Sequence, residues 1–229
     1  MFIGHFAIGM AAKKIEPSVS LGTLFLSAQF LDLLWPTLLL LDVEHVSIDP
    51  GASKVTPLAF IDYPVSHSLV AVIGWSLLLG LIYYFISKDK RASLLVGCLV
   101  LSHWILDAIV HVQDLPLFPG QSPKIGLGVW NNVPLTILIE GVIFVAGVVL
   151  YINIRKSQGR NVNAWFWSLV AFLLIIHIVN LTGPPPPSVS AIAWAGHLQW
   201  LFVLWGWLAD RLPAGQAGYP LSVNRLPDR

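Results

Sequence analysis

The sequence predicts an all-α membrane protein, a polytopic bundle of six transmembrane helices with a short N-terminal half-helix. Two observations carry this prediction. Hydrophobic residues make up 56% of the 229-residue chain and charged residues only 11%, a composition that excludes an ordinary soluble protein. The apolar residues also gather into runs of about 20, the length that a helix needs to cross a hydrocarbon core. We therefore expect a single transmembrane domain over residues 1–211 and a loosely ordered cytoplasmic tail over 212–229.

Six apolar segments are long enough to span the bilayer, and charges or Pro and Gly residues separate them. They cover about 19–41, 64–87, 91–112, 133–154, 163–182 and 190–210. Residues 1–12 are too short to span. We expect them to form a half-helix packed against protein. A helix that ends inside the membrane leaves polar backbone groups at that depth, and these groups need protein neighbours. The single cysteine, Cys98, excludes an intramolecular disulfide.

The Lys and Arg residues predict an orientation for this bundle. Eleven of the 13 basic residues fall on one side of the six-span arrangement, and only Lys54 and Lys124 fall on the other. Because basic loops stay in the cytoplasm, both termini are expected there, with the loops 42–63, 113–132 and 183–189 outside. Membrane lipid is the expected partner, nothing in the sequence indicates nucleic-acid binding, and the oligomeric state stays open.

Ionisable residues within the apolar segments indicate a functional site. His103, Asp107 and His111 are spaced at i, i+4 and i+8, which places them on one face of a helix. Ionisable groups inside a membrane are costly and by default mark function. With a rise of about 1.5 Å per residue, other segments bring further His and Asp residues to the same depth. Imidazoles and carboxylates bind zinc and similar cations, so the candidate metal ligands are His5, Asp32, His67, His103, Asp107 and His111.

Asp32, His67, His103 and Asp107 together offer two imidazoles and two carboxylates. This set suits a divalent metal, with zinc expected, and leaves one position open for water. Such a metal activates water and polarises a phosphoryl or acyl oxygen. Asp107 is therefore a candidate catalytic residue as well as a ligand. Glu140 is a second candidate, as a ligand, a general base or a structural partner. Residues that could orient the ligating imidazoles are Ser66, Ser68, Ser102 and Glu140.

Four short motifs resemble the YdjM-like family of membrane-bound metal-dependent hydrolases. They are Gly4-His5, Leu31-Asp32, Ser66-His67-Ser68 and Ser102-His103-x-x-x-Asp107, and the resemblance covers about residues 1–115. That family is distantly similar to zinc-dependent phospholipases C, all-helical enzymes that cleave phosphodiesters with clustered zinc ions. The resemblance implies that one metal is bound by Asp32, His67, His103 and Asp107, and that His5 and Asp107 bind a second.

These observations favour a metal-dependent hydrolase, above all a phosphoesterase that acts on a lipid or amphiphilic substrate from the outer leaflet. We expect it in a prokaryotic plasma (inner) membrane. A divalent-cation transporter and a non-catalytic protein with a structural metal site are the alternatives. A transporter needs a polar path to the cytoplasmic face, yet the segment Leu94–Leu101 below His103 is apolar except for Gly97 and Cys98.

Overall fold

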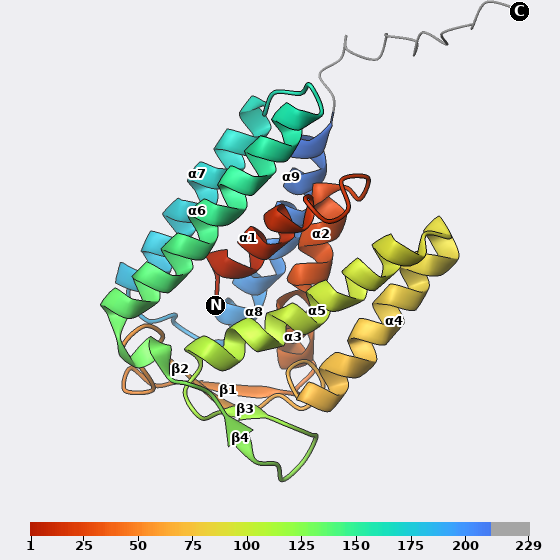
Figure 1. Ribbon diagram of the computed structural model, residues 1–229. Coiled ribbons are helices and arrows are strands. Elements are labelled where there is room, and N and C mark those ends of the chain that lie inside the picture. The colour runs from red at the N-terminus through yellow and green to blue at the C-terminus, as the bar shows by residue number, and fades with distance from the viewer. Residues whose placement is uncertain (212–229) are drawn as a thin grey trace, which may run out of the picture.

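The computed structural model describes residues 1–211, which are mostly helical (Figure 1). The tail predicted over 212–229 lies outside the described residues. In chain order the elements are α1 (Ile3–Ala12), α2 (Leu21–Ala28), α3 (Phe30–Leu40), β1 (His45–Ile48), β2 (Leu58–Asp62), α4 (Leu69–Ser87), α5 (Lys90–Val110), β3 (Leu115–Pro116), β4 (Lys124–Ile125), a 3-10 turn (Val129–Asn131), α6 (Val133–Ser157), α7 (Ala164–Thr182), α8 (Val189–His197) and α9 (Gln199–Asp210).

Four of the described helices, α4 to α7, are long and apolar enough to cross a membrane. The pair α2 and α3 could form a fifth span, bent by 54° at Gln29. These helices are compatible with an integral membrane protein. The predicted count of six spans is not confirmed, because the segment 190–210 divides at Leu198 into two helices that are each too short to span. The polar residues His197 and Gln199 flank this division.

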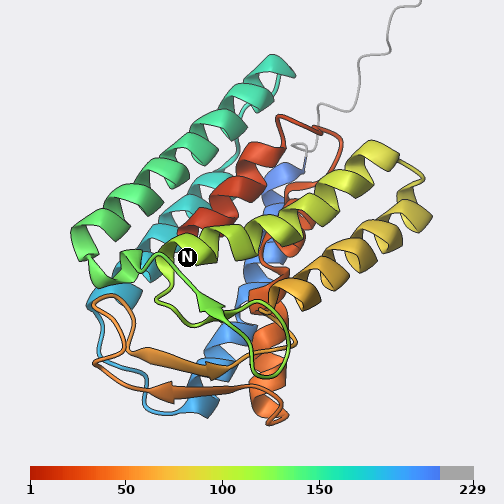
Figure 2. The same ribbon diagram turned by 60° about the horizontal axis from the view of Figure 1, so that its bottom comes forward.

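Two small antiparallel sheets lie together at one end of the bundle, which Figure 2 brings forward. In the first sheet β1 pairs with β2, and in the second β3 pairs with β4. The all-α prediction missed these strands because none is longer than five residues, although β1 alternates polar and apolar residues from His45 to Ile48. His45 is partly exposed on the first sheet, where a hydrogen bond with Asp62 raises its pKa.

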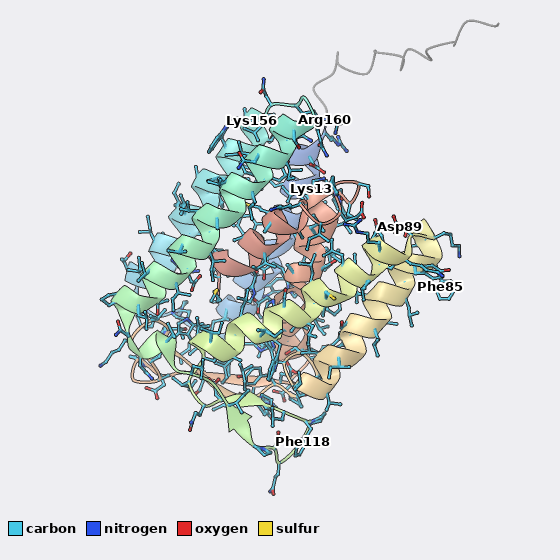
Figure 3. All side chains as sticks on the ribbon, in the orientation of Figure 1. Lys13, Phe85, Asp89, Phe118, Lys156 and Arg160 are labelled. Atoms are coloured by element: carbon cyan, nitrogen blue, oxygen red, sulfur yellow. The ribbon has the colours of Figure 1, made fainter. Side chains whose placement is uncertain are left out.

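Several charged residues lie toward the end of the bundle that is opposite the two sheets. In Figure 3, Lys13, Asp89, Lys156 and Arg160 lie toward one end and Phe118 lies at the other. Lys124, one of the two basic residues assigned to the outer side, lies in β4 at the sheet end. Lys13, Lys156 and Arg160 thus lie away from Lys124 along the bundle, and the membrane orientation expected from the basic residues stays a prediction.

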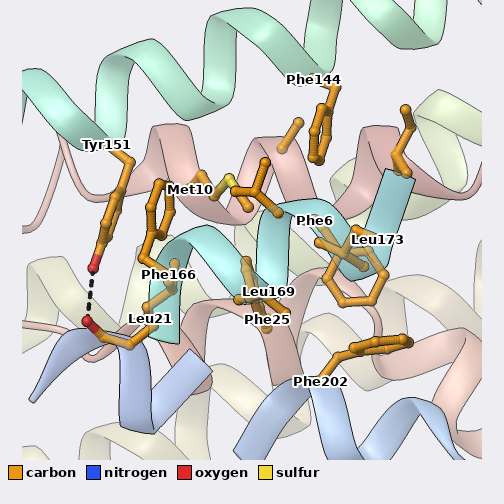
Figure 4. Close-up of a cluster of buried hydrophobic side chains, with 14 of the residues drawn as sticks. Phe6, Met10, Leu21, Phe25, Phe144, Tyr151, Phe166, Leu169, Leu173 and Phe202 are labelled. Atoms are coloured by element: carbon orange, nitrogen blue, oxygen red, sulfur yellow. Dashed lines mark hydrogen bonds between the residues drawn. The ribbon is translucent and has the colours of Figure 1, made fainter. Parts of the chain in front are cut away.

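Helix α1 lies in the centre of the bundle, where protein surrounds it. Eight of its ten residues are buried. Phe6 packs edge-on against Phe25 of α2, with ring centroids 5.1 Å apart, and against Phe202 of α9 at 5.4 Å. Figure 4 shows this cluster, in which Phe144 and Tyr151 of α6 also take part. The short N-terminal helix thus packs inside the bundle, as predicted for residues 1–12.

Large apolar side chains cover the outer faces of α4, α6 and α7. On α4 only Val72 is buried, and Leu77 is 63% exposed. Val145 of α6 and Ile175 of α7 are exposed in the same way. Apolar surface of this extent is rare on soluble monomers. Lipid is the solvent that suits these faces.

The contact between α1 and α6 yields a prediction about stability. A Cβ atom at Gly147 would lie 2.5 Å from the backbone oxygen of Ala7, whereas one at Gly141 meets nothing within 4 Å. Gly147→Ala should therefore push α1 and α6 apart and destabilise the fold by about 1–3 kcal/mol. The matched change Gly141→Ala on the same helix should leave the stability unchanged or raise it, because alanine favours helices. Thermal unfolding in detergent measures both, and equal melting temperatures would contradict this account of the packing.

Candidate metal centre

Five of the six predicted ligands meet where α5 passes beside α1 and α3 (Figure 1). His5 belongs to α1, and Asp32 lies in the first turn of α3. His67 directly precedes Ser68, whose side chain caps the start of α4. His103 and Asp107 lie one turn apart on α5. All except Asp32 are buried, and the Asp32 side chain is 26% exposed, so the cluster is accessible on the Asp32 side.

The donor atoms of these residues are close enough to share a cation. Asp32 Oδ1 lies 3.6 Å from His67 Nε2 and 3.7 Å from His103 Nε2. Asp107 Oδ2 lies 3.1 Å from His103 Nε2 and 3.8 Å from His67 Nε2. Ligands bound at about 2.0–2.2 Å around one ion stand at such separations. Two groups could hold a metal ion, one formed by Asp32, His67 and His103 and the other by His5, His103 and Asp107.

The surroundings of His103 fix which nitrogen carries its proton. His103 Nδ1 lies 2.8 Å from the backbone oxygen of Ala28, so this nitrogen must be the donor. In the neutral imidazole, Nε2 then carries a lone pair. This buried atom has no hydrogen-bond partner among the described residues, although Asp107 Oδ2 is near. A lone pair facing a carboxylate is repulsive, and a cation between the two atoms would turn the repulsion into ligation.

His67 is oriented by a relay that begins outside the helices. The Ser66 hydroxyl donates to Glu44 Oε2 at 2.6 Å, and His67 Nδ1 lies 2.6 Å from the same hydroxyl oxygen. Because the hydroxyl has only one proton, Ser66 must accept from His67 Nδ1–H. Nε2 of the neutral His67 ring therefore carries a lone pair directed toward Asp32. Backbone N–H groups of Val65 and Ser66 also donate to Glu44 Oε1, each at 2.7 Å.

Glu44 is a residue beside the site that the sequence analysis missed. It lies in an acidic stretch of the sequence with Asp42 and Asp49, where a solvated side chain is the ordinary expectation, yet it is buried. Its contact with Ser66 depends on β1 and β2, which return the chain so that the residue before the first strand meets the residues after the second. No local pattern indicates this contact. Of the serines proposed to orient imidazoles, Ser66 contacts His67, whereas Ser102 donates to Leu99 O within its own helix.

Asp107 joins α1 to this site through its other oxygen. Asp107 Oδ1 accepts hydrogen bonds from His5 Nε2 at 3.0 Å and from the amino group of Met1 at 2.6 Å. The His5 ring stacks on His103, with centroids 3.6 Å apart. In this arrangement His5 orients Asp107. Ligation by His5 would require its proton to move to Nδ1, a buried atom without a hydrogen-bond partner among the described residues.

The structure separates His111 and Glu140 from these two metal-binding groups. Helix α5 ends at Val110, so His111 leaves the helical face that carries His103 and Asp107. Its Nδ1 atom instead lies 2.9 Å from Asp114 Oδ1. His111 therefore lies outside both groups that could hold a metal ion, and its role as a ligand stays a prediction. Glu140 Oε2 accepts from the backbone N–H groups of Phe2 and Ile3, at 3.0 and 3.1 Å. This is the structural pairing that the sequence left open beside a role as ligand or general base.

Comparison with protein-family models, with curated proteins and with solved structures finds no match for this chain. The buried His and Asp residues could hold a metal ion.

The relay to Glu44 predicts that Ser66 tunes metal affinity. Ser66→Ala should weaken zinc binding by about 10–100-fold, because residues that orient ligating imidazoles have effects of this size. Ser102→Ala is the matched control, since Ser102 also precedes a histidine of the site but bonds only within α5. The zinc affinity of the Ser102→Ala protein should stay near that of the unchanged protein. Competition with a chelator of known affinity measures both variants, and equal losses in the two would contradict the relay.

Proposed function

We propose that this chain is a membrane-embedded metal-dependent hydrolase, a phosphoesterase for a lipid or amphiphilic substrate, and a member of the YdjM-like family that its motifs resemble. One observation carries the proposal. The Nε2 atoms of His67 and His103 both face Asp32 Oδ1. Because each Nδ1–H donates a hydrogen bond, Nε2 is the nitrogen that carries the lone pair in each neutral ring. This arrangement is costly in an apolar interior unless a cation joins the three atoms.

Zinc fits this donor set better than the alkaline-earth cations. Imidazole nitrogen suits zinc, whereas Mg²⁺ and Ca²⁺ take mainly oxygen ligands. When bound, zinc would supply Lewis-acid activation of water and of a phosphoryl group. Asp32, His67, His103 and Asp107 would hold it, and His5 would keep the Asp107 carboxylate oriented through Oδ1. Asp32, as the exposed member of the group, marks the side from which substrate would approach.

The apolar packing beyond the site favours hydrolysis over cation transport. Between His103 and the Lys90 end of α5, Leu95 and Leu99 pack with Leu24 and Ala28 of α2 in a buried cluster. These side chains offer no ligand to a cation that leaves the site in this direction. We propose a location in a prokaryotic plasma membrane, with both termini cytoplasmic and the Asp32 side open to the outer leaflet.

Metal content tests the site independently of any substrate. The purified chain should retain about one zinc per molecule, measured by elemental mass spectrometry. Asp107→Asn should lose most of it, because the change keeps the size of the side chain and removes its charge. His45→Ala should keep it, because His45 lies on the exposed first sheet. Full zinc content in the Asp107→Asn protein would sink the metal assignment, provided that its melting temperature shows an intact fold.

Hydrolysis requires its own measurement. Release of a water-soluble headgroup from phospholipid or polyprenyl phosphate substrates in detergent should depend on metal and stop after chelation. Asp107→Asn should lower the rate by more than about 100-fold, since residues that merely orient ligands account for about 10–100-fold. His45→Ala should keep the rate. Hydrolysis that strong chelators leave unchanged would reject the mechanism. A zinc-replete protein that hydrolyses none of these substrates would favour the structural metal site instead.

A further inference from the structure

A groove of about 470 Å³ lies between α4 and α5, on the far side of α5 from the metal centre. Small residues bring the two helices together at its floor. A Cβ atom at Gly97 would lie 2.9 Å from Ser76 O, and one at Gly80 would lie 3.1 Å from Ser93 O. The Ser76 hydroxyl also donates to Gly97 O at 2.6 Å. Because these residues are short, the longer side chains beside them form the walls of an open groove.

The walls of the groove are apolar and face outward. Leu77 and Leu81 line it from α4, and Leu94 and Leu101 line it from α5. Leu94 is 70% exposed. Since α4 and α5 are both long and apolar enough to cross a membrane, this outward face suits lipid, and the volume of the groove falls in the range of small-ligand pockets.

One end of the groove carries a positive charge. Lys90, the first residue of α5, lines the groove there together with Tyr84. Among the described residues, Lys90 takes part in none of the ion pairs, whereas Lys13 and Arg155 pair with Asp210 and Arg91 with Glu16. Its ammonium is therefore available to an anion at the membrane surface. Asp89 beside it accepts two backbone N–H groups at the start of α5.

The length of the groove matches one leaflet of a bilayer. From Lys90 to Leu101 the helix advances about 17 Å at 1.5 Å per residue, and half of a hydrocarbon core about 30 Å thick is about 15 Å. We propose that the groove binds one anionic phospholipid of the leaflet at the Lys90 end. Its phosphate would contact Lys90, and its acyl chain would run between α4 and α5 as far as Leu101. This site is independent of the proposed hydrolysis.

Lipid retention tests the proposal. The purified full chain, equilibrated in detergent with equal amounts of phosphatidylglycerol and phosphatidylcholine, should retain mainly phosphatidylglycerol in native mass spectrometry. Lys90→Gln should reduce this retention about fivefold, the effect of one basic residue at an anionic membrane surface. The matched control is Lys88→Gln. Lys88 carries the same charge two residues away, but its ammonium lies over the Phe85 and Tyr84 rings, 5.1 and 5.7 Å from their centroids, and Lys88 does not itself line the groove. This control should keep the lipid.

The single cysteine gives a second readout that needs no substitution. Cys98 is exposed and lines the groove. Alkylation of the folded protein with a bulky maleimide should therefore fill the groove and displace the lipid. Loss of phosphatidylglycerol in both the Lys90→Gln protein and the alkylated protein supports the site. The proposal is overturned if either change leaves retention as it was, if Lys88→Gln lowers it equally, or if the unchanged protein holds the two lipids alike.

Discussion

Asp107 is a carboxylate buried among helices, and such a charge is costly to keep in an apolar interior unless other groups pair with it. Each of its two carboxylate oxygens faces a different part of the structure. Oδ1 faces α1, where His5 and Met1 donate to it. Oδ2 faces His103 on the same helix and His67 at the start of α4. The central place of α1 and the convergence of the site both follow from satisfying this one group.

The position of α1 is secured at each end by a different charge. At its start, Glu140 of α6 accepts the backbone N–H groups that a first helical turn leaves unpaired. Past its other end, buried Lys13 donates to Asp210 of α9 at 2.7 Å and to Val19 O at 2.8 Å. Between these ends, Gly147 lets α6 approach the α1 backbone. A helix too short to span a membrane is thus held at a fixed depth, and His5 with it.

Helix α5 connects two distinct surfaces of the molecule. His103 and Asp107 point from one face into the bundle, whereas Leu94, Cys98 and Leu101 line the groove on the other. Glu44 and Ser66, which lie on either side of the first sheet in the sequence, set the proton position of His67. A change in the loops would therefore reach the proposed metal site through a hydrogen-bond relay, while lipid in the groove would contact only the opposite face.

Features that depend on neighbours along the chain could be predicted from the sequence. Runs of apolar residues set the helices α4 to α7, and the spacing of four put His103 and Asp107 on one face of α5. Features that depend on contacts between distant segments could not be predicted in this way. The division at Leu198, the end of α5 before His111, and the contact of Glu44 with Ser66 all lie outside the reach of local periodicity. The reason is physical: helical spacing fixes which residues share a face, but only packing fixes what that face meets.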